Sequence, residues 1–172
     1  MAIEKITDSN YEGLKQAQRA VLVVGTSWCQ SCRAYKPMIS QLSDSIPYVA
    51  FGEVVLDEKG AAQFKKKYPG ISSWTLPTTL FMRDGKEVHR FSGVHPLQTV
   101  LQTINEKLVA GSTAYVPGNN GRVAAARIKK IVGDRYFLEL LEDSSLGRKN
   151  EIVELTRDEF NMNGLEKKLN GM

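Results

Sequence analysis

The sequence contains few cysteines and few histidines, which narrows the chemistry that it can perform. Its 172 residues include two cysteines, Cys29 and Cys32, and two histidines, His89 and His95. A zinc site would need both distant histidines in addition to the cysteine pair. A disulfide between the cysteines would close a very short loop and add little stability. We therefore expect no metal site and no disulfide scaffold, which leaves redox chemistry or two inert buried thiols as interpretations of the pair.

Long apolar runs are also missing. No run approaches the roughly 18 consecutive apolar residues that cross a bilayer. The first residues, MAIEKITDSNYEG, are polar and lack the apolar core of a secretory signal. We therefore expect no membrane partner and a cytoplasmic location.

Charge of one sign is not concentrated in any segment. The net charge is +4, and the only tight basic clusters are Lys65-Lys66-Lys67 and Lys129-Lys130. Such short clusters are typical of a solvated face, so we expect no nucleic-acid partner. Hydrophobic residues make up 42% of the chain, which is enough for a packed core.

Strand and helix patterns alternate through the first 110 residues. Residues 20–24 (AVLVV) form a short β-branched run that predicts a strand buried on both faces, and residues 30–46 have apolar side chains at helical spacing. The remaining candidates are a first helix at 11–19, a strand at 48–56, a helix at 61–68, strands at 78–82 and 87–91, and a helix at 95–108. The order β-α-β-α-β-α-β-β-α predicts an α/β domain with a central mixed sheet flanked by helices.

The end of the chain has a different pattern. Residues 111–120 are rich in Gly, Ser, Asn and Pro and are expected to be a linker. The strand candidates beyond it are residues 123–132, which also fit a helix, 135–141 and 151–155. Residues 156–159 (TRDE) have the form of a helix capping box. We therefore predict a small β-rich domain over residues 121–172 that ends in a short helix.

The cysteine pair follows the strand at 20–24 and begins the next helix. Unpaired N–H groups and the helix dipole at this position stabilise a thiolate and lower the pKa of Cys29. The thiolate is the nucleophile of thiol–disulfide exchange. Cys32, one turn later, is within reach to resolve a mixed disulfide, and we expect it to lie deeper. The placement predicts that Cys29 attacks and that Cys32 resolves.

The residues around the pair resemble the thioredoxin family. The shared features are Trp28 before the first cysteine, the C-x-x-C motif, Pro37, the segment Leu76-Pro77-Thr78, the Asp84-Gly85 hairpin and Gly93. The resemblance covers residues 1–110 and implies a thioredoxin-like fold there. It also implies a cis peptide at Leu76–Pro77, and a substrate site formed by Trp28, Leu76 and Pro77 beside the thiols.

The resemblance further implies a protein-disulfide reductase. Such an enzyme would act on protein disulfides, use no bound cofactor, and receive electrons from a separate disulfide reductase. Two departures from the family make it harder to infer whether the chain reduces or oxidises its substrates. The family's buried acid would fall at Val23, which cannot accept a proton, and Gln30-Ser31 replaces the Gly-Pro that is common in reductases. Because neither Gln nor Ser adds positive charge, we favour a reductant over a strong oxidant.

Glu53 is a candidate replacement for the missing acid. It lies on the predicted strand at 48–56, near the position where relatives have a buried lysine, and a carboxylate there could shuttle the proton of Cys32. The alternative is that Glu53 points to solvent.

A second function from another class fits the same sequence. The chain could be a thioredoxin-like adaptor in which residues 121–172 recognise a partner and the thiols are regulatory. Those residues contain no cysteine and no histidine. We therefore expect them to select partners or stabilise the fold, and to carry no chemistry.

Overall fold

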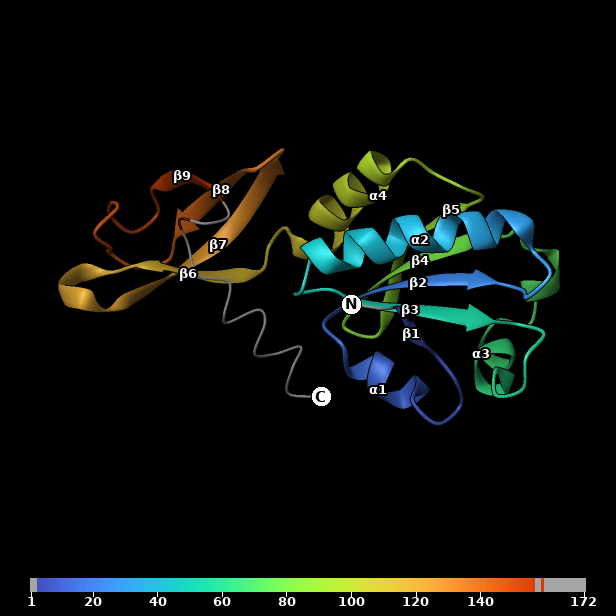
Figure 1. Cartoon of the computed structure of the whole chain (residues 1–172). Helices are drawn as coiled ribbons and strands as arrows, with labels where there is room; N and C mark the ends of the chain where they lie inside the picture. Colours follow the sequence, from blue (N-terminus) through green and yellow to red (C-terminus); the bar gives the residue numbers. More distant parts are fainter. Residues whose placement is uncertain (1–2, 157–158, 160–172) are drawn as a thin grey trace. The chain divides into compact units, whose positions relative to one another are not determined.

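The computed structural model describes residues 3–156 and residue 159, which belong to two compact units, one ending at Thr103 and the other beginning at Ile104 (Figure 1). The first unit contains a five-stranded sheet, and the second contains a four-stranded sheet. The strands are β1 (Glu4–Lys5), β2 (Arg19–Gly25), β3 (Ala50–Val55), β4 (Thr78–Arg83), β5 (Lys86–Ser92), β6 (Thr113–Pro117), β7 (Val123–Val132), β8 (Arg135–Leu140) and β9 (Ile152–Thr156). The helices are α1 (Tyr11–Gln16), α2 (Gln30–Ser45), α3 (Ala62–Lys67) and α4 (Leu97–Ile104), with short helical turns η1 (Ile71–Ser73), η2 (Asn105–Val109) and η3 (Asn119–Gly121).

The first sheet is mixed, as the sequence predicts. Its strands lie in the order β1-β3-β2-β4-β5, with β1, β3 and β2 parallel and the β4–β5 hairpin antiparallel. Helices α2 and α4 cover one face of this sheet, and α1 and α3 cover the other (Figure 1). The sequence patterns gave no range for the edge strand β1, because a strand of two residues is too short to show a period.

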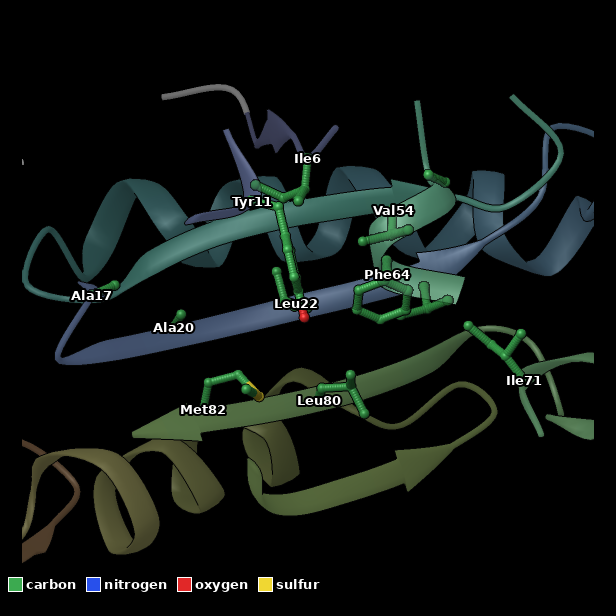
Figure 2. Packing of buried hydrophobic residues seen from close by; sticks show 12 residues of the cluster. Ile6, Tyr11, Ala17, Ala20, Leu22, Val54, Phe64, Ile71, Leu80 and Met82 are labelled. Atoms are coloured by element: carbon green, nitrogen blue, oxygen red, sulfur yellow. The ribbon is translucent and has the colours of Figure 1, made fainter. Parts of the chain in front are cut away.

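Strand β2 lies at the centre of the sheet and is buried along its whole length. Ala20, Leu22 and Val24 belong to the core cluster on the α1 and α3 side, together with residues from both helices. Figure 2 shows Leu22 in this cluster with Tyr11 and Phe64. The unbroken apolar run of β2 follows from this position, because both faces of the strand are covered by helices.

The β4–β5 hairpin has the two-residue turn that its sequence predicts. Asp84 and Gly85 both have positive φ angles, 51° and 78°, as a type I′ turn requires. A Cβ atom at Gly85 would also lie 2.6 Å from the carbonyl oxygen of Lys15. Glycine at this position therefore serves both the turn and the close approach of another backbone segment.

The second unit corrects the predicted domain boundaries. Residues 111–120 are not a linker, because residues 113–117 form β6 and pair with β7. Ala114 and Val116 are buried while their neighbours are exposed, so the segment has the period of two that a half-buried strand requires. The glycine- and asparagine-rich part that suggested a linker is only the short turn η3. The second unit also begins at Ile104, earlier than the predicted boundary at residue 110.

The strands predicted for residues 121–172 are present as β7, β8 and β9. They form an antiparallel sheet in the order β6-β7-β8-β9. The amide of Thr156 donates a hydrogen bond to the carboxylate of Glu159 at 2.6 Å, as one half of a capping box does. The predicted C-terminal helix lies outside the described residues. Among the described helices, none has both the length and the apolar character to cross a membrane.

Candidate active site

The two cysteines lie between the end of β2 and the first turn of α2. Cys29 is the N-cap residue of α2 and forms a disulfide with Cys32, with 5.2 Å between their Cα atoms. The amide of Cys32 donates a hydrogen bond to the Cys29 sulfur at 3.2 Å, and the Ser31 hydroxyl lies 3.4 Å from the same sulfur. The first turn of α2 therefore directs a backbone N–H that has no partner within the helix at the Cys29 sulfur, the arrangement that stabilises a thiolate.

Gly25 gives the Cys32 side chain its space at the end of β2. A Cβ atom at Gly25 would lie 2.8 Å from the Cys32 sulfur and 3.1 Å from the Cys32 Cβ. The first of these separations is shorter than real Cβ contacts. Any larger residue at position 25 would therefore force Cys32 or the strand to move.

The relative burial of the two cysteines differs from our expectation. Cys29 is only 7% exposed in the disulfide form, whereas Cys32 is partly buried. The Cys29 sulfur contacts both the Ser31 hydroxyl and the Cys32 amide within the first turn of α2. The two cysteines also line two different pockets.

The larger pocket is a groove of about 1200 Å³ beside Cys29. Trp28, Cys29 and Leu76 line it, so three of the sequence-predicted site residues lie around one space. Trp28 is 69% exposed, which is unusual for a large aromatic side chain. Pro77 is buried and is not among the residues that line the groove.

The segment at Pro77 has the predicted peptide geometry. The Leu76–Pro77 bond is cis. The Pro77 carbonyl accepts a hydrogen bond from the Gly93 amide at 2.7 Å, and the Thr78 hydroxyl donates to the Thr75 carbonyl at 2.8 Å. These bonds fix the loop that places Leu76 in the wall of the groove.

Asp57 holds the loop before Cys29 and was not identified from the sequence. Its carboxylate accepts hydrogen bonds from both the amide and the hydroxyl of Ser27, the amide at 2.8 Å. These two bonds hold the pKa of Asp57 below its ordinary value. The sequence did contain a signal for this contact, because Asp57 lies two residues after the end of β3 and the parallel strands β2 and β3 end at the same edge of the sheet.

The smaller pocket, of about 190 Å³, lies beside Cys32. Val23, Lys36 and Glu53 line it together with Cys32. Val23 and Glu53 are direct neighbours on β2 and β3. The Glu53 side chain is only 15% exposed, and Lys36 Nζ lies 2.7 Å from its Oε1. Glu53 therefore does not point freely to solvent.

The two histidines lie against a phenylalanine. His95 stacks on Phe91 with 4.2 Å between ring centroids, and His89 meets the edge of the same ring at 4.9 Å. Within residues 3–156 and residue 159, no three His, Cys, Asp or Glu side chains are grouped closely enough to hold a metal ion.

Comparisons with known proteins agree with this geometry. The family model described as Thioredoxin matches residues 2–106. Thioredoxin H-type 1 of Nicotiana tabacum is 30% identical over 91 residues, which cover 53% of this chain and 68% of that protein. The thioredoxin of Chlamydia pneumoniae is 26% identical over 106 residues, which cover 60% of this chain and 97% of that protein.

A solved structure gives the same result for the fold. The X-ray structure of Fasciola hepatica thioredoxin superimposes with a TM-score of 0.51 at 30% sequence identity, and it covers 60% of this chain and 98% of its own. The part of the chain beyond residue 106 lies outside the family match. Because that match includes more than half of the chain, and because Cys29 and Cys32 occupy the start of α2, the chain belongs to the thioredoxin family and is a thiol–disulfide oxidoreductase.

Proposed function

We propose that this oxidoreductase works as a protein-disulfide reductase in which Cys29 attacks and Cys32 resolves. The Cys29 thiolate forms a bond to one sulfur of a substrate disulfide, and the other substrate sulfur leaves as a thiolate. Cys32 then attacks the Cys29 sulfur, which releases the second substrate thiolate and leaves the Cys29–Cys32 disulfide. The substrate gains two electrons, and the enzyme loses two.

The observation that carries this assignment is the hydrogen bond from the Cys32 amide to the Cys29 sulfur at 3.2 Å. A donor fixed by the first turn of α2 stabilises negative charge on Cys29 without a neighbouring cation. Cys29 also lines the large groove, where a protein substrate has room, whereas Cys32 lines the small pocket. Cys29 is therefore our proposed nucleophile because of this donor and because it lines the larger groove, even though its side chain is the more buried of the two in the disulfide form.

The substrate side of the site consists of Trp28, Leu76 and Pro77. Trp28 and Leu76 line the same groove as Cys29. The buried cis-Pro77, next to Leu76, sets the position of Leu76. An extended substrate segment could bury apolar area against Trp28 and Leu76 while its disulfide meets Cys29.

Glu53 is the proton acceptor that we propose for Cys32. Cys32 must lose its thiol proton before it can attack Cys29. Glu53 lines the same small pocket, is largely buried, and is held there by Lys36. Val23 occupies the neighbouring position on β2, so it offers no acid of its own.

Members of this family act on protein disulfides and are themselves reduced by reductases. We extend both roles to this chain, with a separate disulfide reductase as its electron donor and the cytoplasm as its compartment. Insulin reduction by dithiothreitol, with and without the protein, tests the activity. We expect the chain to accelerate precipitation of the insulin B chain and Cys29→Ser to abolish that acceleration. No acceleration by the unsubstituted chain would refute the proposal.

The second unit supports an additional role in partner selection. Its sheet lies beyond the family match and buries its own apolar residues, among them Ile128 and Leu138. Residues 121–172 bring no cysteine or histidine. We propose that this unit recognises partners, as an adaptor would, while the first unit performs the exchange.

A further inference from the structure

Trp74 forms a fixed aromatic wall in the groove beside Cys29. It follows η1 and precedes the cis-proline loop, and it lines the groove together with Trp28. The Arg90 guanidinium lies over the Trp74 ring, 4.2 Å from its centroid, and Tyr68 meets the ring edge at 5.2 Å. Trp28, by contrast, is 69% exposed. The groove therefore has one exposed indole and one indole held by neighbours.

Arg90 is itself held in place. Its Nε and one terminal nitrogen both donate to the Glu87 carboxylate, at 3.0 Å and 2.7 Å to the same oxygen. Both residues lie on β5, so the cation over Trp74 is anchored to the sheet. Ligand binding should lose little side-chain entropy at the stack of Glu87, Arg90, Trp74 and Tyr68, because contacts within the stack already order these side chains.

The size and the lining of the groove indicate a peptide as its occupant. Its volume of about 1200 Å³ exceeds the usual 300–1000 Å³ of a small-molecule site. Most of its wall is apolar, including Ala34, Leu56, Ile71 and Leu76. An aromatic side chain of a bound segment can stack on Trp74, and such pairs add affinity beyond the area that they bury.

Among the described residues, the groove has two charged side chains, Asp57 and Lys65, and they differ in how far hydrogen bonds already engage them. The Asp57 carboxylate is occupied by two hydrogen bonds from Ser27. Lys65 lines the same groove from the last turn of α3, and Lys66 and Lys67 follow it there. Besides the hydrogen bonds from Ser27, the Lys65 charge also contributes to the lowered pKa of Asp57, so the two charges lie near each other. Because Ser27 already engages the Asp57 carboxylate, the Lys65 ammonium is the charged hydrogen-bond donor that the groove offers a ligand, and an acidic residue is its complement.

We propose that this groove selects disulfide-bearing segments that have an aromatic side chain and an acidic side chain beside the reacting cysteine. The aromatic ring packs on Trp74, and the carboxylate reaches Lys65. This inference rests on the proposed function, because it concerns the substrate of the same cysteine pair. It makes Trp74 and Lys65 residues that determine specificity, without a part in the bond-breaking step.

Single-turnover kinetics of the reduced full-length chain test the proposal. The probes are short peptides whose cysteine carries thionitrobenzoate as a mixed disulfide, so attack on the peptide sulfur releases a coloured thiolate. Four motifs are compared: Cys-Phe-Glu, Cys-Ala-Glu, Cys-Phe-Lys and Cys-Ala-Lys. Each is made in two orders, as written and reversed. The mixed disulfide of 2-mercaptoethanol with thionitrobenzoate reports exchange without a peptide.

We expect the preferred order of Cys-Phe-Glu to react about tenfold faster than Cys-Ala-Glu, as a well-formed aromatic pair allows. Trp74→Ala should reduce this ratio to near one, and Trp74→Phe should restore part of it. Lys65→Glu should reverse the preference for Glu over Lys. The same charge change at the adjacent Lys66, which does not line the groove, should leave that preference in place.

Two results would overturn this inference while leaving the proposed function intact. One is equal rates for all four peptides together with fast attack on the mercaptoethanol probe. The other is a Trp74→Ala variant that slows the Phe and Ala peptides equally. If the reduced chain attacks even the mercaptoethanol probe no faster than free dithiothreitol, the proposed function itself fails.

Discussion

Lys36 on α2 reaches across to Glu53 on β3, with 2.7 Å between Nζ and Oε1. The lysine side chain is 51% exposed and the glutamate side chain is 15% exposed, so the carboxylate is the inner partner of the pair. Both residues line the pocket that contains Cys32. The ion pair therefore keeps a carboxylate in the pocket of Cys32, on the strand next to the apolar Val23.

Glu53→Gln should change the pH dependence of exchange. An amide keeps the size of the side chain but cannot accept the Cys32 proton, so resolution of the mixed disulfide should become slower and its pH dependence should change. The measurement is the rate of mixed-disulfide resolution at several pH values across the neutral range. Glu12→Gln is the matched control, because Glu12 also pairs with a lysine but its side chain is 66% exposed, against 15% for Glu53. An unchanged profile for Glu53→Gln removes Glu53 from the mechanism.

The order of the cysteines makes a second prediction. Cys32→Ser should keep the attacking thiol and lose the resolving one, so it should accumulate a stable mixed disulfide with insulin or another protein disulfide. Cys29→Ser should accumulate none, because the remaining thiol lacks the helix N-cap position. Mass spectrometry under non-reducing conditions distinguishes the two. If Cys29→Ser traps substrates and Cys32→Ser does not, the roles are reversed.

The sequence predicted most of the first unit because its local signals agree with its tertiary structure. The apolar run of β2, the spacing of α2 and the Asp84-Gly85 turn each have one dominant interpretation, and each is present. Strand β6 was missed because Gly, Ser, Asn and Pro around it are loop residues by composition. Its alternating Ala114 and Val116 become informative only once β7 is there to pair with them.

The candidate site was predictable where it depends on local sequence, and less so where it depends on pairing. The position of Cys29 at a helix start can be read from adjacent residues. The hydrogen bonds from Ser27 to Asp57 join residues 30 positions apart, and they need the parallel register of β2 and β3. The stack of Arg90 on Trp74 likewise joins β5 to the segment before β4. No periodicity in the sequence indicates such contacts.

Asp57→Asn should weaken the first unit in a pH-dependent way. Bonds from Ser27 hold the pKa of Asp57 below its ordinary value of 3.8, so the folded chain favours the carboxylate more than the unfolded chain does. A lowered folded pKa contributes stability that is present above the unfolded value and is lost as the pH falls through the folded value. The difference in the free energy of unfolding between the two proteins should therefore be largest near neutrality and shrink in acid. Chemical denaturation of both at several pH values measures it, and a difference that grows in acid would contradict the prediction.

Gly25→Ala should destabilise the disulfide form. The new methyl group would lie 2.8 Å from the Cys32 sulfur, and overpacking of this kind costs about 1–3 kcal/mol. We expect a smaller cost in the reduced form, where Cys32 is no longer tied to Cys29, so the disulfide should become easier to reduce. Redox titration against glutathione measures this shift. Gly13→Ala is the control, since nothing lies within 4 Å of its added methyl group and alanine in α1 should stabilise by about 0.5–1 kcal/mol. Equal potentials for the Gly25 variant and the original chain would show that Gly25 does not position Cys32.

A shortened chain that ends at Gly111 should retain exchange with insulin, because every residue assigned to the active site precedes Thr103. It should also be less soluble. Leu108 and Val109 on η2 are buried in the full chain, and η2 packs against β7, so removal of β7 exposes them. Leu108→Ser with Val109→Ser in the shortened chain should restore solubility, which separates exposure of this surface from a loss of folding in the first unit. Insulin reduction and circular dichroism are compared for both shortened chains. A shortened chain that is folded but inactive would show that the second unit helps to form the active site, contrary to the division of roles proposed above.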